Sequence, residues 1–383
     1  MDESVIAAGE AKPPGISVVV PNYNSSRYLA RLLTSIDEAA RPSLPLEVLV
    51  VDDSEPGEVQ ATESLCLAHG ARFLHCAGRV GVKRNFGGRA ARYNLLLFVD
   101  SDCELTPDLL REHAKLLDQP ADVGAMLGPV EFPGADSFMW RAVERSQFLG
   151  PYSFAHRMPY APWGGAGNLS VKGAAYEAIG GFDSGFLQVP GGEDVDLGMR
   201  LNDAGFRIRC NPDALMYHTR ETWQDARKMT RRAVGYGRAH AHILMKHAHR
   251  TGLEFPRPVV VVAGLALLSL VVAAATGAWR PLVWSPLFAA VFFVVQALLL
   301  IRNRPAPPTP RSLAHELAGQ WFNQLYELGV VFESVKQRRM SQTLRKMIYA
   351  PGQLVHEREG KIIQTWSELA GLLVVLFYSG VAP

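Results

Sequence analysis

Residues 95–102 read Leu-Leu-Leu-Phe-Val-Asp-Ser-Asp, and this stretch decides the fold. Five uninterrupted apolar residues bounded by polar ones are typical of a strand that is covered on both faces. Similar runs at Ile16–Val20 and Leu46–Val51 are separated by segments of helical periodicity, such as Arg27–Ala39. Buried strands that alternate with helices predict βαβ units and a mostly parallel sheet with helices on both sides.

Other segments extend this pattern. We expect a strand near Arg72–His75 and helices near Glu58–Ala68, Lys83–Tyr93 and Glu193–Ala204, the last ending at Gly205. Residues 134–163 are rich in aromatic residues and proline, and they predict a helix with a loop over the site. The three glycines in residues 164–167 mark a place where the backbone passes close to another group.

Carboxylates follow two of the predicted strands directly. Ligands of open α/β sheets bind beyond the carboxyl ends of the strands. Asp100 and Asp102 can converge there on a divalent cation that bridges the phosphates of a nucleotide diphosphate, although a D-x-D pair also serves in turns. Asp52 and Asp53 can accept hydrogen bonds from a base or a ribose hydroxyl, and the alternative is a turn or N-cap before Pro56.

A second acidic group opens the helix predicted at Glu193. Acids at a helix N-terminus are also explained by the helix dipole. A reaction at a hydroxyl group needs a base, and Asp194 is the candidate, with Glu193 and Asp196 binding the acceptor or shaping the pocket. His218 follows a short predicted strand, where it either completes a carboxylate metal site or is structural.

Two long uncharged runs follow the α/β part. Pro258–Trp279 has 22 residues without a charge and Pro281–Ile301 has 21, and only Arg280 separates them. Each is long enough to cross a bilayer, so we expect a tight transmembrane hairpin; a buried helical hairpin is the alternative. The preceding segment, Arg220–Arg257, has nine Lys and Arg against three Asp and Glu. Together with Arg302, Arg304 and Arg311 after the hairpin, this excess of basic residues places both ends of the hairpin in the cytoplasm.

The composition narrows the class of protein. The 383 residues are 48% hydrophobic, the formal net charge is +2, and we expect no nucleic-acid partner. The four cysteines lack metal-ligand spacing and indicate reduced thiols in a cytosolic compartment. The turn after the first strand, residues 21–24, has no glycine, which excludes a dinucleotide-binding dehydrogenase. The two apolar runs carry almost no polar groups, which disfavours a transporter or channel.

The sequence therefore divides into four regions. Residues 1–15 form a disordered tail without the apolar core of a signal peptide, so the α/β part should remain in the cytoplasm. Residues 16–250 form the α/β domain and residues 258–301 the hairpin (about 258–279 and 281–301). Residues 302–383 form an amphipathic or interfacial region, whose final uncharged stretch, Leu369–Pro383, is short for a span. We expect a multi-pass protein of the inner membrane.

In this order, the motifs resemble the family 2 glycosyltransferases of the GT-A fold, over roughly Ile16 to His218. The ordered motifs are Val20-Pro21-Asn22-Tyr23-Asn24, Val50-Val51-Asp52-Asp53-Ser54, Lys83-Arg84-Asn85, Phe98-Val99-Asp100-Ser101-Asp102, Gly165-Ala166-Gly167-Asn168 and Gly192-Glu193-Asp194-Val195-Asp196-Leu197.

The resemblance implies a Rossmann-like GT-A catalytic domain that uses a nucleotide-diphosphate sugar and Mg²⁺ or Mn²⁺, with inversion at the anomeric carbon. Asp194 would be the base, and Asp102 would hold the metal, assisted by Asp100 and His218. The implied donor contacts are Pro21, Tyr23, Asn24, Asp52, Asp53, Arg84 and Asp100. The acceptor contacts that we expect are Glu193, Gly165, Asn168 and Asp196.

Two departures from the family refine this expectation. The Q-x-x-R-W motif of processive synthases is absent, since the chain has only Arg231-Arg232-Ala233-Val234-Gly235-Tyr236. This favours transfer of a single sugar to a hydroxyl of a lipid-linked or cell-envelope glycan acceptor. Polyprenyl-phosphate sugar synthases usually lack the Gly-Glu-Asp helix start, which makes that alternative weaker. A catalytically inactive membrane scaffold is the alternative from another class.

Overall fold

A computed structural model describes residues 12–39, 43–183, 186, 191–253, 257–302 and 309–349. The chain divides into two compact units, and each is described by itself. The first, the α/β unit, comprises residues 1–134, 150–188 and 192–220, and the second, the helical unit, comprises residues 135–149, 189–191 and 221–383. Residues 1–11 of the predicted tail and all of Leu369–Pro383 lie outside the described residues.

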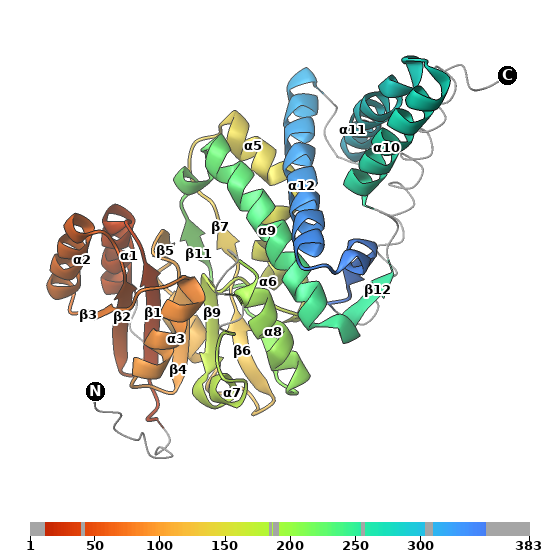
Figure 1. The fold of residues 1–383 in the computed structure, drawn as a ribbon. Helices are drawn as coiled ribbons and strands as arrows, with labels where there is room; N and C mark the ends of the chain where they lie inside the picture. The colour runs from red at the N-terminus through yellow and green to blue at the C-terminus, as the bar shows by residue number, and fades with distance from the viewer. Residues whose placement is uncertain are drawn as a thin grey trace. The chain divides into compact units, whose positions relative to one another are not determined.

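An eight-stranded sheet forms the centre of the α/β unit (Figure 1). In spatial order its strands are β3 (Arg72–His75), β2 (Leu46–Asp52), β1 (Ile16–Asn22), β4 (Leu95–Val99), β9 (Asn168–Lys172), β6 (Val123–Leu127), β10 (Arg207–Cys210) and β8 (Tyr160–Ala161). The pairings between β1, β2, β3 and β4 are parallel, and so is the pairing of β6 with β10, whereas β9 and β8 pair antiparallel with their neighbours. The predicted, mostly parallel sheet is therefore confirmed.

Strand residues alternate between two apolar cores. Ile16, Val18 and Val20 of β1 point into one core, whereas Val19 points into the other. The first core also contains Leu29 and the other buried leucines of α1, as the periodicity predicted. Both faces of the sheet are buried, which explains why these strands read as continuous apolar runs.

The helices of the α/β unit lie close to their predicted positions. They are α1 (Ser26–Glu38), α2 (Pro56–Ala68), α3 (Val80–Ala90), α4 (Leu109–Ala114), α6 (Phe154–Arg157), α7 (Gly173–Ala178) and α8 (Glu193–Asp203). Helix α3 begins three residues before the predicted Lys83 and ends three before Tyr93, because Ala91 already has extended backbone. Gly205 has a φ of 85°, as expected of the glycine that follows a helix C-terminus.

A small second sheet places the residues at the end of β4. Its strands are β5 (Cys103–Leu105), β11 (Met216–His218) and β7 (Val130–Glu131), with β11 in the centre. In the pairing of β11 with β5, His218 lies opposite Cys103. The chain thus brings His218 beside the segment that follows β4.

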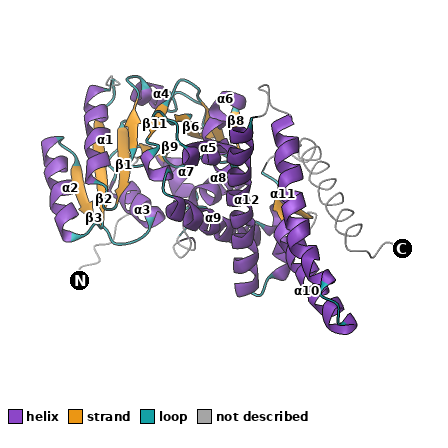
Figure 2. Cartoon of the chain, turned by 90° about the horizontal axis from the view of Figure 1, so that it is seen from above, coloured by secondary structure: helices purple, strands orange, loops and turns teal. Residues whose placement is uncertain are grey.

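The helical unit is built around a long helix, α12 (Pro310–Lys336), drawn in blue in Figure 1. It packs against α9 (Ala226–Lys246) and α5 (Phe138–Arg145), and Figure 2 shows the same helices from above. The unit also contains a two-stranded sheet of β12 (Thr251–Leu253) and β13 (Arg345–Met347). Short 3₁₀ helices among the described residues are η3 (Glu221–Trp223), η4 (Ala248–Arg250), η5 (Arg280–Val283) and η6 (Met340–Leu344), and η1 (Gln147–Ser153) extends from this unit into the α/β unit.

Glycines let α9 and α12 approach closely. A methyl group at Gly237 of α9 would overlap the carbonyl oxygen of Tyr326, and one at Gly329 of α12 would overlap that of Val234. Because α9 packs on α12, it belongs to the helical unit. The first compact unit therefore ends at Arg220, whereas the expected boundary was at residue 250.

The first apolar run forms a helix that could cross a membrane. Helix α10 (Pro258–Thr276) has a mean hydropathy of 2.6 and is almost entirely unburied, and no other helix in the described ranges meets the same criteria of length and apolarity. The second run forms α11 (Trp284–Arg302). Ser285 Oγ donates to the carbonyl oxygen of Val262 at 3.0 Å, so α11 begins beside the first half of α10. A tight hairpin would place Ser285 near the end of α10, so the predicted geometry of two spans is not confirmed.

Candidate active site

The carboxyl ends of the parallel strands meet at one edge of the sheet. Asn22, the last residue of β1, lies opposite Asp52 of β2, and its side-chain amide donates to Asp52 Oδ1 at 2.7 Å. Asp52 is fully buried and also accepts hydrogen bonds from the backbone and hydroxyl of Ser54, at 3.0 and 2.6 Å. Asp52 therefore holds the two strand ends together rather than facing an open space.

The loop after β1 carries the exposed groups of this edge. Tyr23 is 56% exposed, and the Lys83 ammonium lies 5.3 Å from the centre of its ring. Asn24 has a φ of 47°, and its side-chain oxygen accepts from the backbone N–H of Glu55 at 2.9 Å, whereas Pro21 is buried within β1. Of the predicted nucleoside contacts in this loop, Tyr23 and Asn24 are exposed, and Pro21 is buried.

Lys83 was not singled out from the sequence, yet it organises this region. It is 4% exposed, donates to the carbonyl oxygen of Asn22 at 2.5 Å and forms an ion pair with Asp53. Asp53 also accepts from the backbone N–H of Gly78 at 2.9 Å. Lys83 belongs to the Lys83-Arg84-Asn85 motif, which is one of the motifs that carry the family resemblance. The sequence did not show that the Lys83 side chain reaches the end of β1.

Arg84 links three segments of the unit. Its Nη1 donates to Glu193 Oε1 at 2.9 Å, and its Nη2 donates to Asp100 Oδ1 at 2.7 Å. The guanidinium is 4% exposed, and its Nε is buried without a hydrogen-bond partner among the described residues. Burial lowers the pKa of Arg84, but the charges of Asp100, Glu193 and Asp194 raise it by more. The net shift is upward, so the side chain stays cationic.

Asp194 has an unusual proton affinity. Burial raises the pKa of its carboxyl and the Glu193 carboxylate raises it further, while the Arg84 charge lowers it, with a result of about 7. Asp194 Oδ1 accepts from the backbone N–H of Val195 at 2.8 Å, and Oδ2 lies on the side of Gly165. A carboxyl whose pKa lies near neutral pH is suited to accept a proton from a substrate.

Asp102 and His218 form a pair that suits a divalent cation. His218 Nε2 lies 3.3 Å from Asp102 Oδ1, and His218 Nδ1 lies 2.8 Å from the carbonyl oxygen of Thr219. A carbonyl oxygen only accepts, so Nδ1 carries a proton, and in the neutral ring the lone pair of Nε2 faces the carboxylate. Two lone pairs that face each other cannot hydrogen-bond to one another, but both can coordinate a cation placed between them. These residues therefore fit the metal that the family implies.

The neighbours of this pair are less suitable as ligands. Cys103 Sγ lies within 4.8 Å of the ligand atoms of Asp102 and His218, but burial and the nearby carboxylates raise the pKa of this thiol well above its usual value. A buried, protonated thiol is a poor ligand for Mg²⁺ or Mn²⁺, which prefer oxygen. Asp100 Oδ1 is held by Arg84, and its Oδ2 faces Gly167, where an added Cβ would lie 2.6 Å away.

Two residues that were predicted to bind the acceptor are inaccessible. The Asn168 amide donates to the carbonyl oxygens of Pro129 and Ala214, each at 2.9 Å, and Asn168 Oδ1 lies 2.9 Å from His113 Nε2. Asp196 Oδ2 accepts from Arg200 Nε at 2.7 Å. Both side chains are fully buried, so they support the site from below instead of facing a substrate.

Glu193 lies nearer to the open part of the site. It is 8% exposed and is occupied by Arg84. Gly165 has no side chain, and an added Cβ would be 3.6 Å from Tyr152 Cε1 and 4.0 Å from Asp194 Oδ2. Tyr152 and its neighbour Phe132, whose ring centres are 5.1 Å apart, were missed from the sequence because no local pattern distinguishes them.

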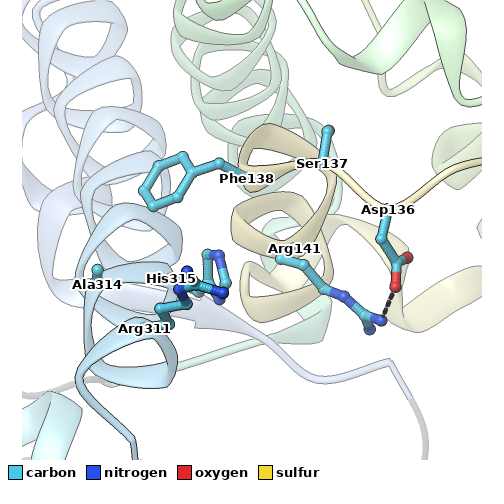
Figure 3. Close-up of a pocket in the computed structure, with 7 residues that line it drawn as sticks. All are labelled: Asp136, Ser137, Phe138, Arg141, Arg311, Ala314 and His315. Carbon is cyan, nitrogen blue, oxygen red and sulfur yellow. Dashed lines mark hydrogen bonds and ion pairs between the residues drawn. The ribbon is translucent and has the colours of Figure 1, made fainter.

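A separate pocket of about 390 Å³ lies in the helical unit, between the first turns of α5 and α12 (Figure 3). Arg141 is paired there with Asp136, as the dashed line in Figure 3 shows, and the Phe138 ring lies 4.9 Å from that of His315. Asp136 is the one carboxylate among the residues that line this pocket, so the pocket lacks the paired carboxylates found at the sheet edge and is not the candidate active site.

Comparisons with known proteins give the family. Residues 17–170 match the model described as Glycosyl transferase family 2, and residues 95–302 match Glycosyl transferase family group 2. The chain is 29% identical over 283 residues to the pre-mycofactocin glycosyltransferase of Mycobacterium tuberculosis, which covers 69% of this chain and 54% of that protein. It is 27% identical over 242 residues to the validoxylamine A glucosyltransferase of Streptomyces hygroscopicus subsp. jinggangensis, covering 55% of this chain and 54% of that protein.

The chain thus spans about half the length of these two relatives. Among solved structures, a mannosyltransferase from Pyrobaculum calidifontis in complex with GDP-Man and Mn²⁺ covers 96% of this chain and 87% of its own, with 18% identity and a TM-score of 0.46. Since one family model describes more than half of the sequence, the chain belongs to the family 2 glycosyltransferases.

Proposed function

We propose that the chain is an inverting glycosyltransferase that moves one sugar from a nucleotide-diphosphate sugar to an acceptor hydroxyl. The bridge that Arg84 makes between Asp100, after β4, and Glu193, at the start of α8, carries this proposal. It brings the strand ends, where ligands of such sheets bind, beside Asp194, which suits a general base. The family and the named activities of the relatives support the same class of reaction.

Asp194 performs the proton transfer in this proposal. The acceptor oxygen attacks the anomeric carbon from the side opposite the diphosphate, and its proton passes to Asp194. A carbon–oxygen bond to the acceptor forms as the bond to the diphosphate breaks, and the nucleotide diphosphate leaves with the electron pair. Oδ2 serves the acceptor, because Oδ1 already accepts from Val195.

We assign Asp102 and His218 as ligands of a Mg²⁺ or Mn²⁺ ion, with Asp100 assisting through the oxygen that Arg84 does not occupy. Such an ion offsets the negative charge that develops on a departing diphosphate. Arg84 contributes a fixed positive charge on the same side. Its buried Nε, unpartnered among the described residues, is a further donor in this region.

The nucleoside end of the donor belongs near the β1 and β2 ends. We propose that Tyr23 and Asp53 contact it, since Tyr23 is exposed and Asp53 is held at the surface by Lys83 and Gly78. Pro21, Asn24 and Asp52 shape this pocket, because their own contacts fix the two strand-end loops.

We further propose that the protein is a multi-pass inner-membrane protein with its α/β unit in the cytoplasm, and that its acceptor is a lipid-linked or cell-envelope glycan. The length and hydropathy of α10 support insertion. Only part of the basic segment before α10 can attract anionic lipid headgroups, because Arg238 is paired with Glu333 and Arg257 with Glu327. The exposed bases at the start of α9 remain to attract anionic lipid; they are Arg227, Lys228 and Arg231.

Hydrolysis of a panel of uridine- and guanosine-diphosphate sugars by the purified full chain tests the proposed function. We expect slow, Mn²⁺-dependent release of nucleotide diphosphate from one donor, with water as the acceptor. Binding of Mn²⁺ and nucleotide diphosphate without hydrolysis of any donor would favour the inactive scaffold. A rate that rises only when a polyprenyl phosphate is added would favour the alternative synthase.

A further inference from the structure

Gly165 opens a space that two side chains of different chemistry share. A Cβ placed on this residue would lie 3.6 Å from Tyr152 Cε1 and 4.0 Å from Asp194 Oδ2, both at ordinary contact distance. A ring carbon of Tyr152 and the second oxygen of the proposed base therefore both lie within contact distance of this position. An acceptor placed here, with one hydroxyl near Asp194 Oδ2, would contact Tyr152.

Tyr152 belongs to a row of rings that runs toward the proposed metal site. Its ring meets Phe132 edge to face, with centres 5.1 Å apart, and Phe132 lies 5.1 Å from the imidazole of His218. Arg220 fixes the backbone below this row, because its guanidinium donates to the carbonyl oxygens of Phe132 and Gly134, each at 2.6 Å. Tyr152 and Phe132 are both partly exposed.

We propose that Tyr152, supported by Phe132, stacks against the C–H face of a saturated, polyhydroxylated ring in the acceptor, a pyranose or a cyclitol. This inference rests on the proposed function and names the acceptor class of the same site. Such a ring has an apolar face and hydroxyls around its edge, so stacking on an aromatic surface aims one edge hydroxyl at Asp194. A flexible linear alcohol gains no comparable orientation from the wall.

The test compares ring and linear acceptors of similar hydroxyl content. With the donor found by hydrolysis, release of nucleotide diphosphate is measured with a panel of methyl pyranosides and inositol, and in parallel with sorbitol and glycerol. We expect the wild-type protein to accelerate with at least one ring acceptor and to ignore the linear ones. Equal use of linear acceptors, or no acceleration by any ring, would overturn the proposal.

Variants locate the effect at the aromatic wall. Tyr152→Ala should raise the KM for the ring acceptor about tenfold, equivalent to about 1.4 kcal/mol, and lower the ratio of transfer to hydrolysis by a similar factor. Tyr152→Phe keeps the ring and should restore the KM, which shows that an altered fold is not the cause. Tyr217→Ala is the matched control, since Tyr217 is 37% exposed on β11 beside His218 but faces away from the buried side of that strand.

The outcomes separate this inference from the reaction itself. An unchanged acceptor KM in Tyr152→Ala would overturn the stacking role while leaving the glycosyltransferase assignment intact. Absence of donor hydrolysis in the wild-type protein would instead overturn the proposed function, on which the inference rests.

Discussion

Arg84 Nη1 donates a hydrogen bond of 2.9 Å to Glu193 Oε1, and this contact joins the helix that carries the donor-side cation to the helix that carries the proposed base. Asp194, the next residue, is influenced by both partners. Burial raises the pKa of the Asp194 carboxyl, Glu193 raises it further, and Arg84 lowers it. The two partners of this contact therefore shift, in opposite directions, the pH at which the proposed base becomes available.

Turnover should increase with pH and reach half of its plateau near pH 7. Asp194 accepts a proton only as the carboxylate, and its pKa is about 7, so the base is lost as the pH falls below that value. Arg84→Met removes a charge that lowers this pKa, and the midpoint of the kcat profile should move to higher pH. Arg84→Lys retains the charge and should stay close to the wild type. A midpoint that is unchanged in Arg84→Met would contradict the assignment of the titrating group.

Asp194→Asn should reduce kcat by about a hundredfold or more, because the amide cannot accept the proton. Donor affinity, measured by calorimetry, should remain near the wild-type value, since no donor contact is removed. Asp203→Asn, an exposed change at the end of the same helix, is the control. Near-normal turnover in Asp194→Asn would move the role of base to Glu193.

Asp102→Asn should abolish the Mn²⁺-dependent part of donor binding. An amide oxygen carries no charge, so the site formed with His218 loses most of its attraction for a cation. Titration of Mn²⁺ and of nucleotide diphosphate in the presence of Mn²⁺ measures both effects, and Asp108→Asn at an exposed position serves as the control. If Mn²⁺-supported affinity survives in Asp102→Asn, the metal site lies elsewhere.

Replacing Leu267 and Val271 of α10 by lysine together should release the full chain from membranes. These side chains are 65% and 57% exposed, so the change should leave packing within the chain almost intact. Each lysine near the centre of a span costs about 3 kcal/mol of insertion free energy. Flotation with vesicles that contain anionic lipid measures the loss, and Leu67→Lys in α2, where Leu67 is 85% exposed, is the control. Undiminished flotation of the double variant would exclude α10 as the anchor.

Gly237→Ala should lower the free energy of unfolding of the helical unit by about 2 kcal/mol, because the new methyl group overlaps the Tyr326 carbonyl. Gly57→Ala in α2 places its methyl group where no atom lies within 4 Å and should be nearly neutral. Thermal unfolding of the two variants checks the difference. Equal melting temperatures would show that α9 and α12 are less tightly packed than the contact implies.

The sequence predicted those parts of the fold that local patterns encode. The strands around Leu95–Val99 are continuous apolar runs because both faces are covered, and the burial of α1 follows from its periodicity. The predicted start of α3 was three residues too late, because Val80 and Gly81 do not resemble a helix start. The position of α11 beside Val262 depends on packing between segments, for which periodicity gives no signal.

The positions of the candidate site residues in the sheet could be predicted from the sequence, but their burial and contacts could not. Acidic residues after strands were located correctly, but the sequence could not show which of them are buried. Asn168 and Asp196 were predicted to contact the acceptor, but Asn168 is bonded to His113 and Asp196 to Arg200, and no local pattern indicates these pairings. Tyr152 carried no signal in the sequence, because its proposed role depends on its position beside Gly165 and Asp194 in the folded chain.

The order of helices in the helical unit has a consequence for its synthesis. Helices α5 and α9 pack on α12, which begins only at Pro310, after α10 and α11. Because a chain emerges from its N-terminus, α5 and α9 wait without their main partner while the apolar helices are being made. If α10 inserts into a bilayer as proposed, it is available for insertion before the helical unit can close around α12, so that insertion would precede this assembly and would not compete with it.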